Sequence, residues 1–324
     1  MPDSNAASSV MPIRAALSVC VLLFLPGLLC AQQAAYAGLA SFPADTQQVA
    51  YLNLAELRSS PDYPQIRQHV LSQQLHGFQL FLRSVGVDPE KDIDEVALGW
   101  RGETLSGSGS FGVAAGRFEP DKVQQFFSKT QLPLPSYRGF NLFAFGSGAD
   151  PEDTFFTFLD SSLAAFGRLH DLKALIDVRE GSADGLDKNQ TFRGYETELE
   201  ETAPQWGILS GKAAANAAVP WLAGGKKTTA DMTAFLEPVQ AVLYRVDWDG
   251  GFTAHISVVC KTPETAAGLF QLLNILKSAP SPVASGGSGT ASLLQNLDAR
   301  QSESRLELTA SGPADALDQI LKVD

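Results

Sequence analysis

Residues 239–277 constrain the fold more than any other part of the chain. Residues 239–248 are rich in β-branched and aromatic side chains, which favour a strand. The Asp249-Gly250 pair that follows favours a tight hairpin turn, because such turns need positive φ. Residues 252–258 then alternate between apolar and polar side chains, the pattern of a strand with one buried face. This stretch therefore predicts a β-hairpin.

A helix is predicted directly after the hairpin. Thr262 can cap its N-terminus, Pro263 suits the first helical position, and Glu264 complements the helix dipole. Apolar residues then recur at helical spacing and predict a buried stripe: Ala266, Phe270, Leu273 and Leu276. A two-stranded hairpin is marginal on its own, so we expect this helix to pack across a larger sheet.

The same strand-to-helix junction recurs along the chain. Proline opens a predicted helix at Pro120 and Pro313 as it does at Pro263, and a fourth junction near Gly167 lacks the proline. We interpret this as a recurring β-β-α unit, produced by duplication or by convergent use of a favourable junction. The predicted fold class is α+β, with antiparallel sheets and helices on one face.

The composition predicts a single domain. The chain has 324 residues, of which 44% are hydrophobic, which is ample for a core. We predict an α+β domain over residues 38–324, with two similar halves at about 38–203 and 204–324. A long helix is expected from about Pro64 to Val85. Residues 278–292 are rich in Ser, Gly and Pro, which predicts a flexible linker within the domain.

The N-terminal region predicts export. Arg14 precedes an uncharged apolar run, residues 15–31, and small residues then allow cleavage after Ala31 or after Ala37. This is the layout of a secretory signal peptide, so residues 1–37 are expected to be a removable signal and the protein to be periplasmic or extracellular.

Two alternatives to a cleaved signal remain open. The apolar run could be retained as a membrane anchor, although it is short and contains Pro26. Cys30 could carry a lipid, although the preceding Leu29 fits a lipidation site poorly. Membrane contact is expected only in these two cases.

Charge and motifs exclude several functions. The net charge of −12 argues against nucleic-acid binding, which needs basic patches. Residues 107–112 match GxGxxG, but a strand is predicted after them where a dinucleotide site needs a helix. Residues 224–229 resemble a phosphate loop but have Pro220 where that loop needs glycine. We therefore predict no cofactor, no catalytic residue and no metal ligand from local motifs.

Isolated ionisable residues give weak signals. His69 and His76 share one helix face but make an incomplete metal site, so we interpret them as solvated. His170-Asp171 could act as a general-base pair, although no nucleophile is indicated. Cys260 is the sole cysteine after the signal, so it forms no internal disulfide and is interpreted as a small buried residue.

Two further groups were candidates for binding sites. An acidic cluster lacks the glycine of a calcium loop: Asp88, Asp92, Asp94 and Glu95. Three tryptophans could line a ligand site, although core positions are commoner: Trp206, Trp221 and Trp248.

Residues 42–70, FPADTQQVAYLNLAELRSSPDYPQIRQHV, and residues 85–100, VGVDPEKDIDEVALGW, resemble an uncharacterised family of bacterial exported proteins. The resemblance is best over the first hundred residues. It implies export and no particular activity, so no catalytic residue is carried over.

Three functional hypotheses follow. The first is an exported, non-catalytic envelope or periplasmic protein that binds a protein partner or an apolar ligand through an apolar patch without convergent ionisable groups. The second is a periplasmic hydrolase or metal-dependent enzyme, which requires two or more of four residues to converge in one cleft: His170, His255, Asp247 and Asp249. The third is an anchored assembly component, which would keep or lipidate its N-terminus.

Overall fold

The structure is a computed structural model that describes residues 32–70, 73–102, 110–130, 132, 134–150, 152–199, 203–216, 234–278 and 297–313; side chains are not described for 68–78. The chain divides into two units, Met1–Gln33 and Ala34–Asp324. The described strands and helices lie in the second unit, apart from the first residue of one helix.

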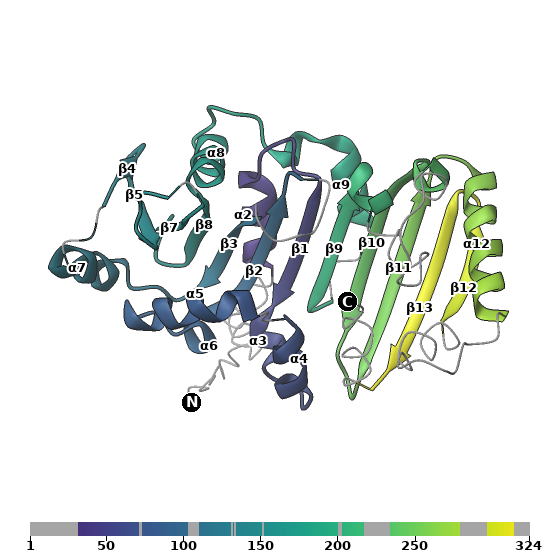
Figure 1. Ribbon diagram of the computed structural model, residues 1–324, viewed down its shortest axis with the longest axis horizontal. Coiled ribbons are helices and arrows are strands. Elements are labelled where there is room, and N and C mark those ends of the chain that lie inside the picture. Colours follow the sequence, from purple (N-terminus) through teal and green to yellow (C-terminus); the bar gives the residue numbers. More distant parts are fainter. Residues whose placement is uncertain are drawn as a thin grey trace, which may run out of the picture. The chain divides into compact units, whose positions relative to one another are not determined.

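An antiparallel sheet of eleven strands organises the described part of the second unit, and Figure 1 shows it as one continuous row. In spatial order the strands are β12 (Asp298–Ser302), β13 (Arg305–Gly312), β11 (Phe252–Cys260), β10 (Val239–Asp247), β9 (Gln205–Ser210), β1 (Gln48–Asn53), β2 (Ile93–Trp100), β3 (Ser110–Gly116), β8 (Leu163–Arg168), β7 (Thr154–Phe158) and β6 (Phe143–Phe145). A separate two-stranded sheet pairs β4 (Ser136–Tyr137) with β5 (Phe140–Asn141).

One arrangement of elements occurs twice along this sheet. Strands β1, β2 and β3 are sheet neighbours in chain order, helix α7 (Pro120–Thr130) follows, and the β7-β8 hairpin returns to place β8 beside β3. Strands β9, β10 and β11 are followed in the same way by α12 (Pro263–Ser278) and by the β12-β13 hairpin, which places β13 beside β11. The two runs meet where β1 pairs with β9. The division into similar halves at 38–203 and 204–324 stays a prediction.

The predicted α+β class is confirmed, but helices lie on both faces of the sheet. Neighbouring residues of a strand point to opposite faces, and in β3 both sets are apolar: Val113 packs in one core cluster and Ala114 in another. One face packs against α2 (Gln33–Ser41), α8 (Leu169–Arg179) and α9 (Gln190–Glu198). The other packs against α3 (Leu54–Leu57), α4 (Tyr63–Val70), α5 (Gln73–Ser84), α7 and α12. The central strands have apolar side chains on both faces, and both faces are covered by helices. The prediction of helices on one face was wrong in this respect.

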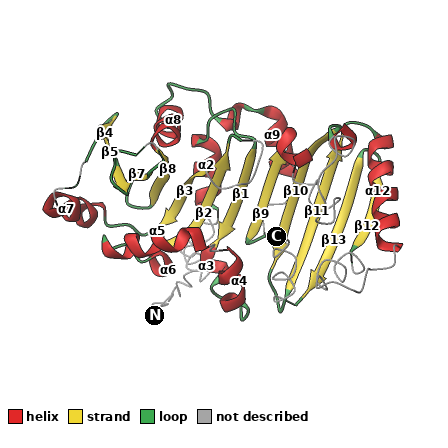
Figure 2. Ribbon diagram, viewed as in Figure 1, coloured by secondary structure: helices red, strands yellow, loops and turns green. Residues whose placement is uncertain are grey.

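Short helical segments complete the description. Helix α6 (Pro89–Asp92) precedes β2, and the 3-10 helix η1 (Leu186–Lys188) precedes α9. Figure 2 shows the helices in red along the yellow strands. The helix predicted from Pro64 to Val85 corresponds to α4 and α5, with residues 71–72 between them outside the description.

The hairpin and helix expected over residues 239–277 are confirmed as β10, β11 and α12. Gly250 and Gly251 in the turn have φ values of 65° and 131°, so glycine is required there by the backbone. Pro263 is the first residue of α12, and the Thr262 hydroxyl accepts the Thr265 N–H at 3.3 Å. The linker expected at 278–292 lies, apart from Ser278, outside the described residues.

Helix α2 is part of the core although five of its nine residues, 33–37, fall within the predicted signal and before the predicted domain start at residue 38. Ala34, Ala35 and Leu39 are buried in the cluster formed with β1, β2 and β3. The Ala34 N–H donates to Oε2 of Glu95 on β2 at 2.9 Å, and Glu95 is only 6% exposed. Burial, together with the neighbouring Glu95 carboxylate, raises the pKa of the Tyr51 hydroxyl. Glu95 therefore attaches the start of α2 to the centre of the sheet.

We expect Glu95→Ala to lower the free energy of unfolding by about 1–3 kcal/mol, because the buried Ala34 N–H loses its acceptor. Glu95→Gln keeps a side-chain carbonyl as acceptor and should lose less. Urea unfolding at neutral pH measures both, with exposed Lys261→Ala as control. An alanine variant as stable as the wild type would show that this contact contributes nothing.

Candidate functional site

The enzyme hypothesis needs two or more of its four ionisable residues in one cleft, and two of the four share one sheet face. His170 lies on α8 beside β8, whereas His255 lies on β11, and the sheet order places β3, β2, β1, β9 and β10 between those two strands. Asp249 is exposed in the hairpin turn. Asp247 is on β10, on the same sheet face as His255. The structure therefore brings Asp247 and His255 to one surface and keeps His170 away from it.

His255 belongs to a hydrogen-bonded polar face on the second run of strands. Its Nδ1 lies 3.4 Å from the Thr309 hydroxyl on β13. The Ser257 hydroxyl on the same face donates to Glu307 Oε1 at 2.7 Å. These contacts join polar side chains across β11 and β13, which is a common way to stabilise a solvated sheet face.

His170 and Asp171 are neighbours, as expected from their sequence. His170 Nε2 lies 3.2 Å from Asp171 Oδ2, and Arg101 Nη1 lies 3.7 Å from Oδ1. Asp171 is 3% exposed, and burial raises the pKa of its carboxyl although His170, Arg101 and Arg168 lower it. Arg101 also pairs with Asp45 at 3.2 Å. The group attaches the start of α8 to the segment after β2, which is a structural role.

The acidic cluster at residues 88–95 is used for structure. Asp88 caps α6, and Asp92 accepts the Asp88 N–H at 2.7 Å. Asp94 pairs with Arg58 at 2.9 Å, while Glu95 points to α2. Across the described residues, no group of three or more His, Cys, Asp or Glu side chains could hold a metal ion.

Two of the tryptophans and the cysteine are core residues. Trp206 stacks on Tyr51 with ring centroids 5.3 Å apart. Trp248 is buried and its Nε1 donates to Gln205 Oε1 at 3.2 Å. Burial raises the pKa of the Cys260 thiol, so this thiol is a poor nucleophile.

Other candidates fall outside the described residues, and their interpretations stay predictions: the side chains of His69 and His76, Trp221, and the loop 224–229. Half of the GxGxxG match, residues 107–109, is outside as well, and its other half, residues 110–112, opens β3, the strand that was expected there.

Helix α12 carries apolar residues on two sides. Ala266, Leu269 and Leu273 are buried against the sheet. Leu272 and Ile275 lie on another side, where Ile275 is 66% exposed and Leu272 is half-buried. An amphipathic surface helix needs only one apolar stripe. The second stripe marks α12 as a candidate interaction element, because exposed apolar patches commonly mark binding sites.

Phe235 extends this second stripe. It is 40% exposed and lies beside α12, so that a Cβ at Gly268 would be 3.6 Å from its ring. Gly268, Leu272 and Ile275 follow at i, i+4 and i+7, which places them on one helix face. Phe235, Gly268, Leu272, Ile275 and the half-buried Leu276 are here called the α12 surface.

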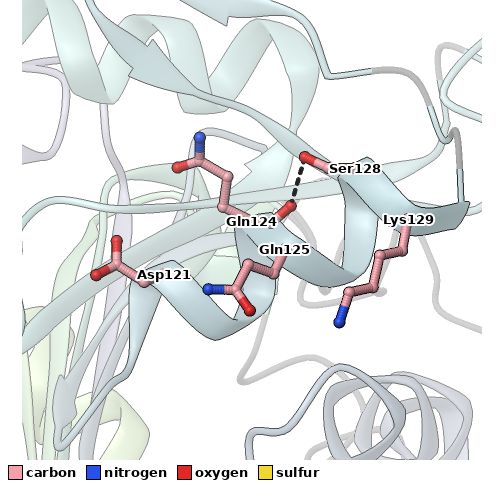
Figure 3. Close-up of a pocket in the computed structure, with 5 residues that line it drawn as sticks. All are labelled: Asp121, Gln124, Gln125, Ser128 and Lys129. Atoms are coloured by element: carbon pink, nitrogen blue, oxygen red, sulfur yellow. Dashed lines mark hydrogen bonds between the residues drawn. The ribbon is translucent and has the colours of Figure 1, made fainter.

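Helix α7 occupies the matching place in the first run of strands, and its outer side is polar. Figure 3 shows this side, with a depression lined by Asp121, Gln124, Gln125, Ser128 and Lys129. Gln125 and Lys129 stand at the same distances from the first residue of α7 as Gly268 and Leu272 do from the first residue of α12. Both helices bury their inner sides on the sheet. The outer chemistry thus differs at these two positions, and the α12 surface brings together two of the exposed large apolar residues of the described chain, Phe235 and Ile275.

Comparisons with known proteins show the fold alone. No protein-family model and no curated protein sequence matches the chain. Solved structures of TP0453 are similar: crystal forms III and I at TM-score 0.52 with 9% and 10% identity, and form IV at TM-score 0.51 with 10% identity. Each alignment covers 88% of this chain and 96–97% of the other. The architecture is therefore shared along nearly the whole of TP0453.

Within the ranges given above, no helix combines the length and the apolarity that crossing a bilayer requires.

Asp171 should make stability depend on pH. Because burial raises its pKa, the folded chain keeps this proton where the unfolded chain has lost it. The contribution of Asp171 to stability therefore falls as the pH rises from the ordinary value, about 3.9, through the raised folded value. Relative to Asp171→Asn, the wild type should lose stability across this window in urea unfolding at a series of pH values. Exposed Asp249→Asn is the control; a wild type that gains stability relative to Asp171→Asn would contradict the direction.

Two substitutions on α12 should separate its two apolar sides. Leu273 is 7% exposed, so Leu273→Ala should lower the free energy of unfolding by about 2–5 kcal/mol through lost burial and a cavity. Ile275→Ala, on the outer side, should stay within about 0.5 kcal/mol of the wild type. Thermal and urea unfolding measure both. A large loss from Ile275→Ala would mean that the outer stripe stabilises the fold itself.

Proposed function

We propose that this chain is an exported, non-catalytic protein of the bacterial cell envelope that binds a protein partner through the α12 surface. The observation that carries the proposal is the second apolar side of α12, on which Ile275 is 66% exposed. Burying that side chain in an interface would gain about 25 cal/mol per Å² of apolar area. The α12 surface is the location that we assign to the partner binding expected from the sequence.

The shape of the surface favours a protein over a small apolar ligand. Small ligands bind in concave sites that enclose most of their surface. The α12 surface is the outer side of a helix, and its apolar side chains Leu272, Ile275 and Leu276, at i, i+3 and i+4, have the spacing of the anchors of a helix that lies in a groove of another protein. Phe235 adds an aromatic side chain, a residue type enriched in protein interfaces.

The charge of α12 favours a protein over a lipid surface. Helices that lie in membrane interfaces usually carry several Lys or Arg residues on their polar side. The polar residues of α12 include one cation and one acid, Lys277 and Glu264, together with Gln271 and Asn274. The whole chain has a net charge of −12, which an anionic membrane would repel.

Export is supported by the sequence. The apolar run at residues 15–31 with its flanking residues fits a secretory signal, and the resemblance to exported bacterial proteins points the same way. The non-catalytic assignment is supported by the separation of His170 from Asp247 and His255 across the sheet.

Site-specific photo-crosslinking in the host envelope tests the proposal. A photoreactive residue at Ile275 should capture one defined protein, whereas the same residue at exposed Asn274, on a different side of α12, should not. Ile275→Glu should weaken binding of the captured protein at least about tenfold, and Asn274→Glu should leave it within about twofold.

Two results would contradict this function. Equal capture from positions 274 and 275 would show that the apolar side is not selective. Crosslinks from position 275 to lipid alone would replace the protein partner with a membrane surface.

A further inference from the structure

We infer that export removes residues 1–31, by hydrolysis of the Ala31–Gln32 bond, and that the mature chain keeps α2. This inference rests on the proposed export. Water cleaves the amide, leaving a carboxylate on Ala31 and an α-amino group on Gln32, and the catalyst is a signal peptidase of the host envelope. The sequence pattern alone favours the other position, because Ala35-Tyr36-Ala37 has small residues at both recognised places and Leu29-Cys30-Ala31 has only one.

The burial of α2 in the core favours a cleavage that leaves this helix intact. Ala34, Ala35 and Leu39 are buried together with β1, β2 and β3. Cleavage after Ala37 would remove the first two of these from the core and would leave only residues 38–41 of the helix. Four residues are too few to hold a helix without further support. Cleavage after Ala31 leaves the whole of Gln33–Ser41 in place.

Glu95 is the second argument. Its carboxylate accepts the Ala34 N–H at 2.9 Å and is nearly excluded from solvent. A negative charge at this end of a helix is stabilised by the helix dipole. Removal of Ala34 would take both this donor and that dipole from a buried carboxylate, whose desolvation then costs more. A chain that begins at Gln32 retains both.

The new terminus is the third argument. Gly38 is buried beside Ala97 and Phe42, so a chain that begins there would place a charged α-amino group on a residue packed among apolar side chains. Burying a charge among apolar side chains is unfavourable unless it is paired.

Intact-mass measurement of the full-length chain, expressed in a host with an export pathway and purified from its envelope, tests the inference. A mass that starts at Gln32 is the expected result. A start at Gly38 would overturn the inference and leave export intact, and so would a lipidated chain that starts at Cys30. A chain that retains residues 15–31 would overturn both export by a cleaved signal and this inference.

A second measurement tests whether residues 32–37 stabilise the folded chain. Chains with defined starts at Gln32 and at Gly38, released from a removable N-terminal fusion, should differ in stability. We expect the chain that starts at Gly38 to unfold at a clearly lower urea concentration. Glu95→Ala should reduce the difference between the two urea midpoints, because it removes the Ala34–Glu95 hydrogen bond from the longer chain. Equal midpoints for the two starts would overturn the assigned role of α2.

Discussion

The pairing of β1 with β9 is the interaction on which the rest of the structure depends. Residues 48–52 pair with residues 205–209, and this ladder joins the two runs of strands into one sheet. Tyr51 and Trp206 face each other across it and stack in the core. Strands that are distant in sequence must lose much chain entropy before they pair. The aromatic contact and the helices that cover it offset this cost at the centre of the sheet.

On either side of this centre, the two runs of strands have the same arrangement of elements, but their helices differ in surface chemistry. In both runs a helix that starts with proline packs on the same side of the sheet, and its inner residues are apolar. The outer side is polar on α7 and apolar on α12. Because the sheet fixes the position of each helix, the outer residues are free to change without affecting the core. A fold with repeated positions can therefore stay stable while one position changes its surface chemistry.

The sequence predicted the local features well. The hairpin at residues 239–260 and the start of α12 at Pro263 follow from turn chemistry and capping, which depend on neighbours in the chain. Features that depend on distant residues were missed. The expectation of helices on one face missed that both faces of β3 are covered. Glu95 was grouped with an acidic cluster because its partner, Ala34, is far away in the sequence.

The candidate site shows the same limit. Leu272 and Ile275 are apolar residues in an apolar helix, and only their exposure in the fold separates them from the buried Leu273. A sequence signal for them existed, since the apolar residues of α12 cover more than the single stripe that packing requires. This signal could be interpreted only by comparison with α7, and the equivalence of α7 and α12 follows from the sheet order, which the sequence does not show.

The central ladder also sets the order in which strands can pair when the chain emerges N-terminus first. β1 can pair with β2 early, but its other edge stays open until residues 205–210 have emerged. An open edge with apolar side chains is a template for pairing with other chains. A newly made copy therefore passes through a period in which Val49 and Tyr51 lack their partner strand. Holding factors that bind extended, apolar segments would act on this chain during that interval.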